Sequence, residues 1–206
     1  MKDKIQIAVL VSGGGTNLQA LLDAQKNGAL HSGEIALVLS NKPGVYALER
    51  AAAAGVKTAV VNKKECASNA EFEAKVKDTL EANGIELIVL AGFLCILSAD
   101  FTRAYERRII NVHPSLIPSF CGEGMYGLKV HEAALNKGVK VTGATVHFVN
   151  EVPDGGEILL QKAVDVLPGD TPELLQRRVM EQAEWLLLPR AAELVAEKLL
   201  REREKR

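Results

Sequence analysis

The sequence predicts an α/β protein with a doubly wound, mostly parallel sheet, helices on both of its faces and an antiparallel C-terminal strand. Three observations favour this fold. Short apolar runs alternate with helical patterns from the first residues, the runs are rich in isoleucine and valine, and a glycine closes several of the helical patterns. This alternation is typical of βαβ units, in which consecutive strands pair in parallel.

The first half of the chain supplies five of the expected strands. They are predicted at residues 5–12, 34–41, 56–62, 85–93 and 109–113, with helices between them at 16–28, 46–55, 69–84 and about 98–107. The third helix is amphipathic, because Phe72, Val76 and Leu80 recur at a spacing of four residues. Gly28 and Gly55 mark helix ends.

The pattern changes after Pro114. Residues 115–127 contain three glycines and a proline and predict a long loop, which in a compact domain is usually functional or disordered. A helix is expected at 128–138, followed by strands at 139–150 and 158–168 that could pair antiparallel across the turn 151–157. A last helix runs from Thr171 toward Leu188, where we expect Pro189 to kink or interrupt it.

Composition sets modest bounds on function. The 206 residues suit one large domain or a domain with a small appendage, and 48% hydrophobic with 25% charged residues indicates an ordinary core. The net charge of −1 gives no hint of nucleic-acid or membrane affinity, and the N-terminal segment lacks the pattern of a secretory signal. Cys66, Cys95 and Cys121 form no C-x-x-C pair, so we expect free thiols, which fit the cytoplasm.

A group of polar residues lies at the end of the fifth expected strand. Asn111 and His113 are two positions apart, so their side chains point to the same face, and Pro114 then stops the pairing. Open α/β sheets place their ligands at such strand ends. An amide to hold an oxyanion, an imidazole to move a proton and a carboxylate, Asp154, to orient it suit attack on a carbonyl carbon.

The segment SGGGTN, residues 12–17, joins the first strand to the first helix. Its glycines allow a ligand to approach the backbone, and the N–H groups at the helix start form an anion site. Alternatively, Thr16 or Asn17 only caps the helix. A dinucleotide fingerprint would need a third glycine and an acidic residue after the second strand, and a P-loop would need a terminal G-K-[ST]. The loop therefore favours a phosphomonoester.

Each of these residues has an ordinary interpretation when taken alone. His113 could be a packed histidine, Asn111 a turn residue and Asp154 part of an Asx-turn before two glycines. For His131 and His147 we expect a structural or supporting role. Three activities fit the combination: transfer of an acyl group, hydrolysis of the same donor, and sugar-phosphate binding without catalysis.

Four blocks of the chain resemble the glycinamide ribonucleotide formyltransferases of the folate-dependent formyltransferase family. They are residues 9–22, 89–98, 111–120 and 143–161, and with their spacing they cover about the whole chain. HPSLIP and the distal aspartate also occur in methionyl-tRNA formyltransferases and formyltetrahydrofolate deformylases. Sequences of those two kinds of enzyme are longer than 206 residues. The position of the SGGGTN loop close to the N-terminus therefore favours a resemblance to the ribonucleotide enzymes.

The resemblance implies a site for each substrate and no metal. The donor would be 10-formyltetrahydrofolate and the acceptor the amine of 5′-phosphoribosylglycinamide. Residues 1–110 would form a phosphate-binding half and 111–206 a catalytic and folate-binding half. Catalytic roles fall to Asn111, His113 and Asp154, phosphate binding to Gly15, Thr16 and Asn17, other substrate contacts to Pro114 and Glu184, and folate binding to Leu90, Leu94, Cys95, Ile96, Leu97, His147, Val149, Asn150 and Glu151.

Three features depart from the family pattern or leave a choice open. Cys95 and Asn69 stand where better-known members have arginine, the first beside the pterin and the second near the phosphate site. In the last helix Glu181 and Glu184 are both candidates for the substrate contact, and the spacing to Pro189 favours Glu184.

Overall fold

A single seven-stranded sheet forms the centre of the protein, and the computed structural model describes residues 4–205. The strand order is β3-β2-β1-β4-β5-β6-β7. All pairs from β3 to β5 are parallel, and β5–β6 and β6–β7 are antiparallel, which confirms the predicted fold class. The strands are β1 (Ile5–Val11), β2 (Gly33–Ser40), β3 (Lys57–Val60), β4 (Leu87–Leu90), β5 (Ile109–His113), β6 (Val141–Phe148) and β7 (Ile158–Asp165).

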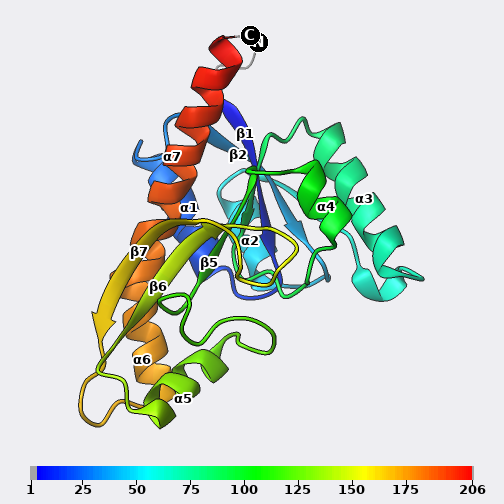
Figure 1. The fold of residues 1–206 in the computed structure, drawn as a ribbon. Helices are drawn as coiled ribbons and strands as arrows, with labels where there is room; N and C mark the ends of the chain where they lie inside the picture. The colour runs from blue at the N-terminus through cyan, green and yellow to red at the C-terminus, as the bar shows by residue number, and fades with distance from the viewer. Residues whose placement is uncertain (1–3, 206) are drawn as a thin grey trace.

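Helices cover both faces of the sheet (Figure 1). The α-helices are α1 (Thr16–Lys26), α2 (Tyr46–Ala53), α3 (Asn69–Ala82), α4 (Ala99–Ala104), α5 (Leu128–Lys137), α6 (Pro172–Val179) and α7 (Trp185–Glu204). A 3₁₀ turn, η1 (Lys63–Glu65), precedes α3, and a π segment, η2 (Met180–Glu184), joins α6 to α7. In Figure 1, α1 and α7 lie on one side of the sheet, and α3 and α4 lie on the other.

The two faces of the sheet pack into separate hydrophobic cores because strand side chains alternate in direction. From β1, Ile7 and Val9 join the core under α1, α2, α6 and α7, whereas Ala8 and Leu10 join the core under α3 and α4. All seven residues of β1 are buried, as expected for the central strand of a sheet covered on both sides.

Of the two outcomes expected at Pro189, an interruption of the last helix is wrong, whereas a kink at this proline stays a prediction. Pro189 lies inside α7, and the irregular segment is η2, which ends five residues earlier. A proline has no N–H for the carbonyl four residues before it, and its ring crowds that carbonyl. The wider π turn directly ahead of α7 is where the helix changes its hydrogen-bond register, so the chain continues as a helix through the proline.

The fourth strand is shorter than the apolar run that predicted it. The expected strand covers 85–93, whereas β4 ends at Leu90. Gly92 then adopts a φ of 73°, and residues 91–98 have no regular structure. This irregular segment matters because it forms one wall of the candidate site.

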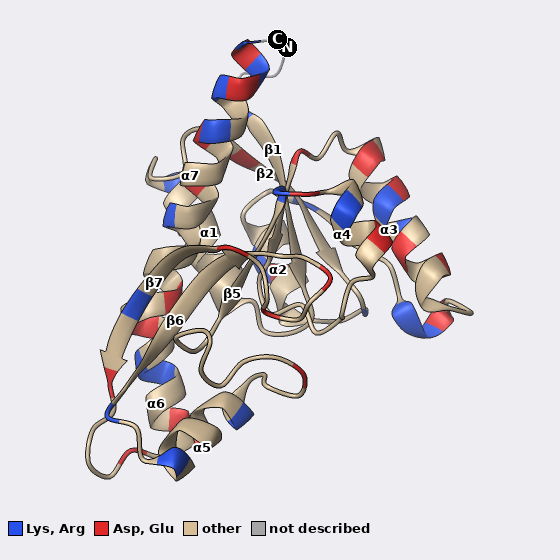
Figure 2. Ribbon diagram, viewed as in Figure 1, with Lys and Arg blue, Asp and Glu red and all other residues tan. Residues whose placement is uncertain are grey.

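Residues of both charges occur along the helices. Figure 2 shows Lys and Arg interspersed with Asp and Glu along α3 and along the C-terminal half of α7. Pairs such as Lys75–Glu71 and Arg201–Glu197 account for part of this pattern. Within residues 4–205, none of the helices is long and apolar enough to cross a membrane.

Candidate active site

The carboxyl ends of the parallel strands converge on one edge of the sheet, where open α/β sheets bind their ligands. The Leu94 backbone N–H donates to Ser12 Oγ at 2.9 Å, which ties the segment after β4 to the loop after β1. Asn41, after β2, donates to Cys95 Sγ at 3.1 Å. The irregular segment 91–98 is therefore held by contacts from two neighbouring strand ends.

The predicted catalytic residues come together with a second histidine. Asn111 Nδ2 lies 3.2 Å from His147 Nε2, directly across the β5–β6 pair. Asp154 Oδ1 lies 3.5 Å from His147 Nε2, and Asp154 Oδ2 lies 3.5 Å from His113 Nδ1. Both imidazoles are buried. The carboxylate thus sits between two imidazoles, and the amide joins one of them.

Main-chain atoms of the loop after β5 contact the other side of this group. The His113 Nε2 atom lies 2.8 Å from the Phe120 carbonyl oxygen, and the Gly122 N–H donates to Asp154 Oδ2 at 2.8 Å. Phe120 and Asp154 are two of the few non-glycine residues with positive φ, at 51° and 56°. Such strained backbone is usually found where function demands a particular geometry.

Burial and charge act in opposite directions on the His113–Asp154 pair. Burial lowers the pKa of His113, and the Asp154 charge and the Phe120 carbonyl offset only part of this effect, so the pKa of His113 stays below its usual value. Burial raises the pKa of Asp154, but hydrogen bonds from His147 and Gly122 and the His113 charge outweigh it, and this pKa is lowered. Asp154 is therefore ionised at neutral pH.

His147 belongs to the site, beyond the supporting role expected for it. Its Nδ1 lies 2.8 Å from the Phe148 carbonyl oxygen, and its Nε2 faces both the Asn111 amide, at 3.2 Å, and Asp154 Oδ1, at 3.5 Å. The strand register reveals the contact, because Asn111 and His147 are cross-strand partners, and that antiparallel pairing could not be read from the sequence.

His131 is the buried histidine that remains outside this group of contacts. It lies on α5 with neither ring nitrogen hydrogen-bonded among the described residues. Burial, with a smaller effect from His113, lowers its pKa to about 4, so the ring is neutral at physiological pH. The expected structural role agrees with this environment.

The SGGGTN loop leaves the first N–H groups of α1 free of side-chain caps. Gly15 is the N-cap, with φ 74°, and no side chain caps the helix, so the capping interpretation of Thr16 and Asn17 is not supported. A Cβ on Gly15 would lie 2.7 Å from the Ala47 Cβ, so packing against α2 already requires this glycine. At Gly14 an added Cβ meets nothing within 4 Å.

A buried carboxyl connects the phosphate loop to the π segment. Asn17 Nδ2 donates to Glu184 Oε2 at 2.7 Å, and Glu184 is 6% exposed. Burial raises the pKa of Glu184 to about 7, against the opposing effect of the Asn17 hydrogen bond. Glu181 instead pairs with Arg177 on the surface. Of the two candidates, Glu184 is therefore the one beside the loop.

A cavity of about 140 Å³ opens beside the catalytic group. It contains every expected folate-binding residue except Leu94, which lines a neighbouring cavity. Phe93, Val152 and Pro153 also line it, although the sequence did not single them out. The lining residues are Leu90, Phe93, Cys95, Ile96, Leu97, Asn111, His147, Val149, Asn150, Glu151, Val152, Pro153 and Asp154.

Neither Cys121 nor Ser115 is arranged as a nucleophile. Burial, and then the charge of Asp154, raise the pKa of the Cys121 thiol, which disfavours the reactive thiolate. Ser115 donates to the Ser119 carbonyl at 2.5 Å and so acts within the turn. Asn69, expected near the phosphate site, donates to Glu73 from the start of α3 and lines the cavity that Leu94 also lines.

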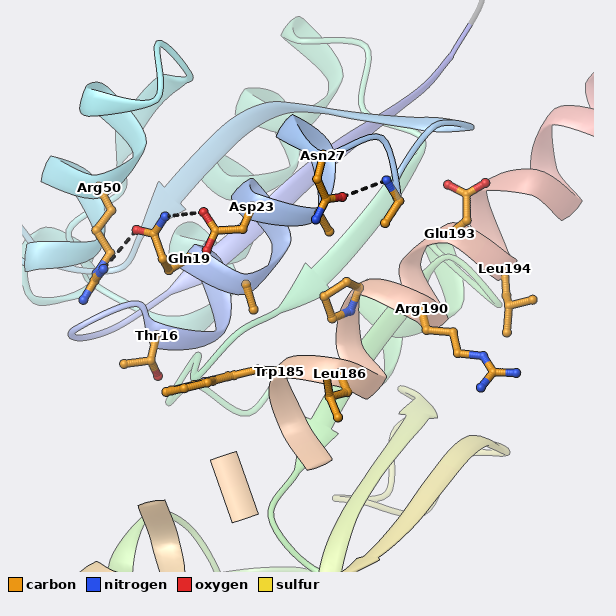
Figure 3. Close-up of a pocket in the computed structure, with 14 residues that line it drawn as sticks. Thr16, Gln19, Asp23, Asn27, Arg50, Trp185, Leu186, Arg190, Glu193 and Leu194 are labelled. Atoms are coloured by element: carbon orange, nitrogen blue, oxygen red, sulfur yellow. Dashed lines mark hydrogen bonds between the residues drawn. The ribbon is translucent and has the colours of Figure 1, made fainter. Parts of the chain in front are cut away.

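A larger cavity, of about 650 Å³, lies along the groove between α1 and α7 (Figure 3). Arg50 stands at one end of the view, where it is hydrogen-bonded to Gln19, and Trp185, Leu186 and Arg190 line the other side. Thr16 is the one predicted site residue on its wall, and none of the catalytic group reaches it.

Known proteins share this fold and are similar in sequence. The sequence pattern of the formyl transferase family matches residues 5–191. The structure of glycinamide ribonucleotide transformylase 1 from Symbiobacterium toebii superposes with a TM-score of 0.89 at 42% identity, covering 96% of this chain and 90% of that one. A phosphoribosylglycinamide formyltransferase from Bacillus Halodurans gives a TM-score of 0.86 at 34% identity, covering 94% and 96%.

The chain belongs to the formyl transferase family. Within that family, the phosphoribosylglycinamide formyltransferase of Haemophilus influenzae is 41% identical over 89% of this chain and 84% of its own length. The trifunctional purine biosynthetic protein adenosine-3 of Gallus gallus is 47% identical over 94% of this chain, which spans only 19% of that longer protein.

Proposed function

We propose that this chain transfers the formyl group of 10-formyltetrahydrofolate to the primary amine of 5′-phosphoribosylglycinamide. The products are formylglycinamide ribonucleotide and tetrahydrofolate, a step of purine biosynthesis. The observation that carries the proposal is the position of Asn111, His113 and Asp154. They meet beside a cavity lined by both apolar and polar residues, at the same sheet edge as an uncapped glycine loop suited to a phosphomonoester.

The two halves of the chain contribute different groups to the site, and the folate cavity is lined by residues of both. Residues 1–110 contribute the phosphate loop with Gly15, Thr16 and Asn17, and residues 111–206 contribute the catalytic group. Glu184 accepts a hydrogen bond from Asn17, and we expect it to contact the ribose or the amine of the ribonucleotide when that substrate binds. Pro114 ends β5 and leaves room for that substrate. The folate ring occupies the 140 Å³ cavity.

The amine attacks the formyl carbon directly, without a covalent enzyme intermediate and without a metal. The formyl oxygen becomes an oxyanion, which the second N–H of the Asn111 amide and a protonated His113 stabilise. Asp154 favours the imidazolium by charge. It also orients a water that carries the proton from the attacking amine to the departing folate nitrogen.

Both nitrogens of His113 are occupied in this structure, one by Asp154 and the other by the Phe120 carbonyl. For His113 to donate to the oxyanion, one of these contacts has to open. The Phe120 carbonyl is on the loop, so we expect a shift of residues 119–122 when the donor binds. The Asp154 contact stays in place and favours the charged form of the ring, against the burial that lowers the pKa of His113.

The test is a transfer assay that follows tetrahydrofolate formation with and without the ribonucleotide. The expected result is product that depends on the amine. Equal rates without the ribonucleotide would mean that water is the nucleophile and that the chain is a deformylase. The relatives that match most of the chain carry the name of the transferase, which also favours amine-dependent transfer.

We further propose that the chain works in the cytoplasm on small-molecule substrates, with no nucleic-acid or membrane partner. The three cysteines are free, as the reducing cytoplasm maintains them, and the net charge is −1. Fractionation of cells that express a labelled chain tests the location.

A further inference from the structure

A single carboxylate on α3 holds the end of the irregular segment 91–98. Ser98 is the last residue of this segment and the N-cap of α4. Its backbone N–H donates to Glu73 Oε1 at 2.7 Å, and its hydroxyl donates to Glu73 Oε2 at 2.5 Å. The Glu73 carboxylate therefore fixes both the main chain and the side chain of Ser98.

Glu73 is a buried carboxylate whose hydrogen-bond donors are neutral. It is 8% exposed, and its third donor is the Asn69 amide, which lies one turn earlier on α3 and 2.9 Å from Glu73 Oε1. Removal of a carboxylate from water costs free energy, which the three charge-assisted hydrogen bonds offset. An apolar side chain would pack α3 without that cost but would leave the Ser98 N–H without this acceptor. The carboxylate therefore serves the irregular segment rather than the packing of the helix.

The preceding residue on α3 supports the same segment nearer its start. The Phe72 ring is fully buried and stacks on the Phe93 ring, with centroids 6.5 Å apart and an interplanar angle of 18°. Phe93 in turn lines the proposed folate cavity. Two neighbouring residues of one helix thus contact the segment through Phe93 and Ser98, and residues 94–97 run between these contacts.

The residues between the two contacts form a wall of the proposed folate cavity. Cys95, Ile96 and Leu97 all line it. Residues 93–98 belong to neither a helix nor a strand, so regular backbone hydrogen bonds do not fix their position. When such a wall takes its binding arrangement for only a fraction of the time, the apparent affinity for the ligand falls by that fraction.

We infer that Glu73 is a positioning residue for the folate donor, which holds residues 95–97 in their binding arrangement through its two hydrogen bonds to Ser98. The inference rests on the proposed function, because the ligand is the same. Glu73 is not among the residues that line the cavity, so it acts on the donor only through this wall. Its loss should weaken donor binding and leave the chemical step at Asn111 and His113 intact.

The test substitutes Glu73→Gln and measures kcat and both KM values. The amide keeps the size of the side chain, but its NH₂ group faces either the N–H or the hydroxyl of Ser98, so at least one of the two hydrogen bonds is lost. The KM for 10-formyltetrahydrofolate should rise roughly three- to tenfold, as for a wall that takes its binding arrangement about 10–30% of the time. The kcat and the KM for the ribonucleotide should stay close to wild type. Glu81→Gln, at an exposed position of the same helix, is the matched control.

A second variant tests the same contact from the other side. Ser98→Ala removes only the hydroxyl and should also raise the KM for the donor. The effects of Glu73→Gln and Ser98→Ala should be less than multiplicative in the double variant, because both remove the same contact. Ser98→Ala also carries the test if Glu73→Gln does not fold.

Binding measurements give a readout that does not need catalysis. In calorimetry, Glu73→Gln should lose affinity for tetrahydrofolate by the same factor as the change in KM and keep its affinity for the ribonucleotide. Hydrogen exchange in a peptide that covers residues 91–98 should be faster in the variant and slow again when tetrahydrofolate saturates it. Unchanged affinity for tetrahydrofolate, or an equal loss for both ligands, overturns the role of Glu73. Absence of formyl transfer in the wild-type protein, with tetrahydrofolate binding weakened in the variant as expected, would instead refute the proposed function.

Discussion

The buried Glu184 carboxyl should make the stability of the protein depend on pH. Its pKa is raised from 4.5 to about 7, mainly by burial. Between these values the unfolded chain ionises Glu184 while the folded protein keeps it protonated, so the free energy of unfolding falls as the pH rises. Above about pH 7 the folded protein also ionises Glu184, and the free energy of unfolding falls no further on account of this residue. The pKa difference of about 2.5 corresponds to about 3 kcal/mol.

The substitution Glu184→Gln tests this dependence, because glutamine keeps an oxygen that accepts from the Asn17 amide but cannot ionise. Wild type should lose stability between pH 5 and pH 8, and the variant should not. The free energy of unfolding of the variant minus that of wild type should therefore increase by roughly 2–3 kcal/mol from pH 5 to pH 8. Urea unfolding of both proteins at several pH values measures this, and Glu181→Gln on the surface is the control. If the difference between the two proteins is the same at pH 5 and pH 8, Glu184 does not have a higher pKa in the folded protein than in the unfolded chain.

Four further predictions concern the site. Asn111→Ala should lower kcat by roughly 10²–10³ with both KM values nearly kept, and unchanged kcat in steady-state assays would remove it from the oxyanion role. Asp154→Asn withdraws the charge that raises the pKa of His113, so the loss of kcat with rising pH should begin at a lower pH, and an unaltered pH–rate profile would reduce Asp154 to a turn residue. Gly14→Val should weaken ribonucleotide binding far more than folate binding in calorimetry, because its added side chain has space in the free protein and would block only the ligand; equal losses would indicate misfolding. Cys95→Ala should change turnover only mildly, since the thiol merely accepts a hydrogen bond from Asn41, and complete inactivity of a folded variant would contradict this.

Local patterns predicted the strand and helix order well, because each element of this fold carries its own periodicity. All five parallel strands, the loop 115–127 and the antiparallel pairing of β6 with β7 were read from the sequence. The end of β4 was missed, because the apolar run continues through Phe93 although Gly92 turns the chain. The π segment was also missed, since the proline stands several residues after the irregularity that accommodates it.

The site was predictable where neighbouring residues define it and unpredictable where distant segments meet. Asn111 and His113 share a face because they are two positions apart, which the sequence alone provides. The approach of His147 depends on the register between β5 and β6, and the position of Asn69 depends on how α3 packs. Long-range packing of this kind leaves no local pattern in the chain.

Residues 120–122 reach His113 and Asp154 with a carbonyl and an N–H, and no side chain takes part. Substitution of the side chains in this stretch therefore leaves the same two backbone groups present, whereas a deletion or insertion moves both at once. In a library of randomised variants we expect position 121 to vary, glycine to be retained at position 122, where φ is 91°, and the number of residues to stay constant. The length and backbone geometry of this stretch are then what keep the two main-chain groups in contact with His113 and Asp154.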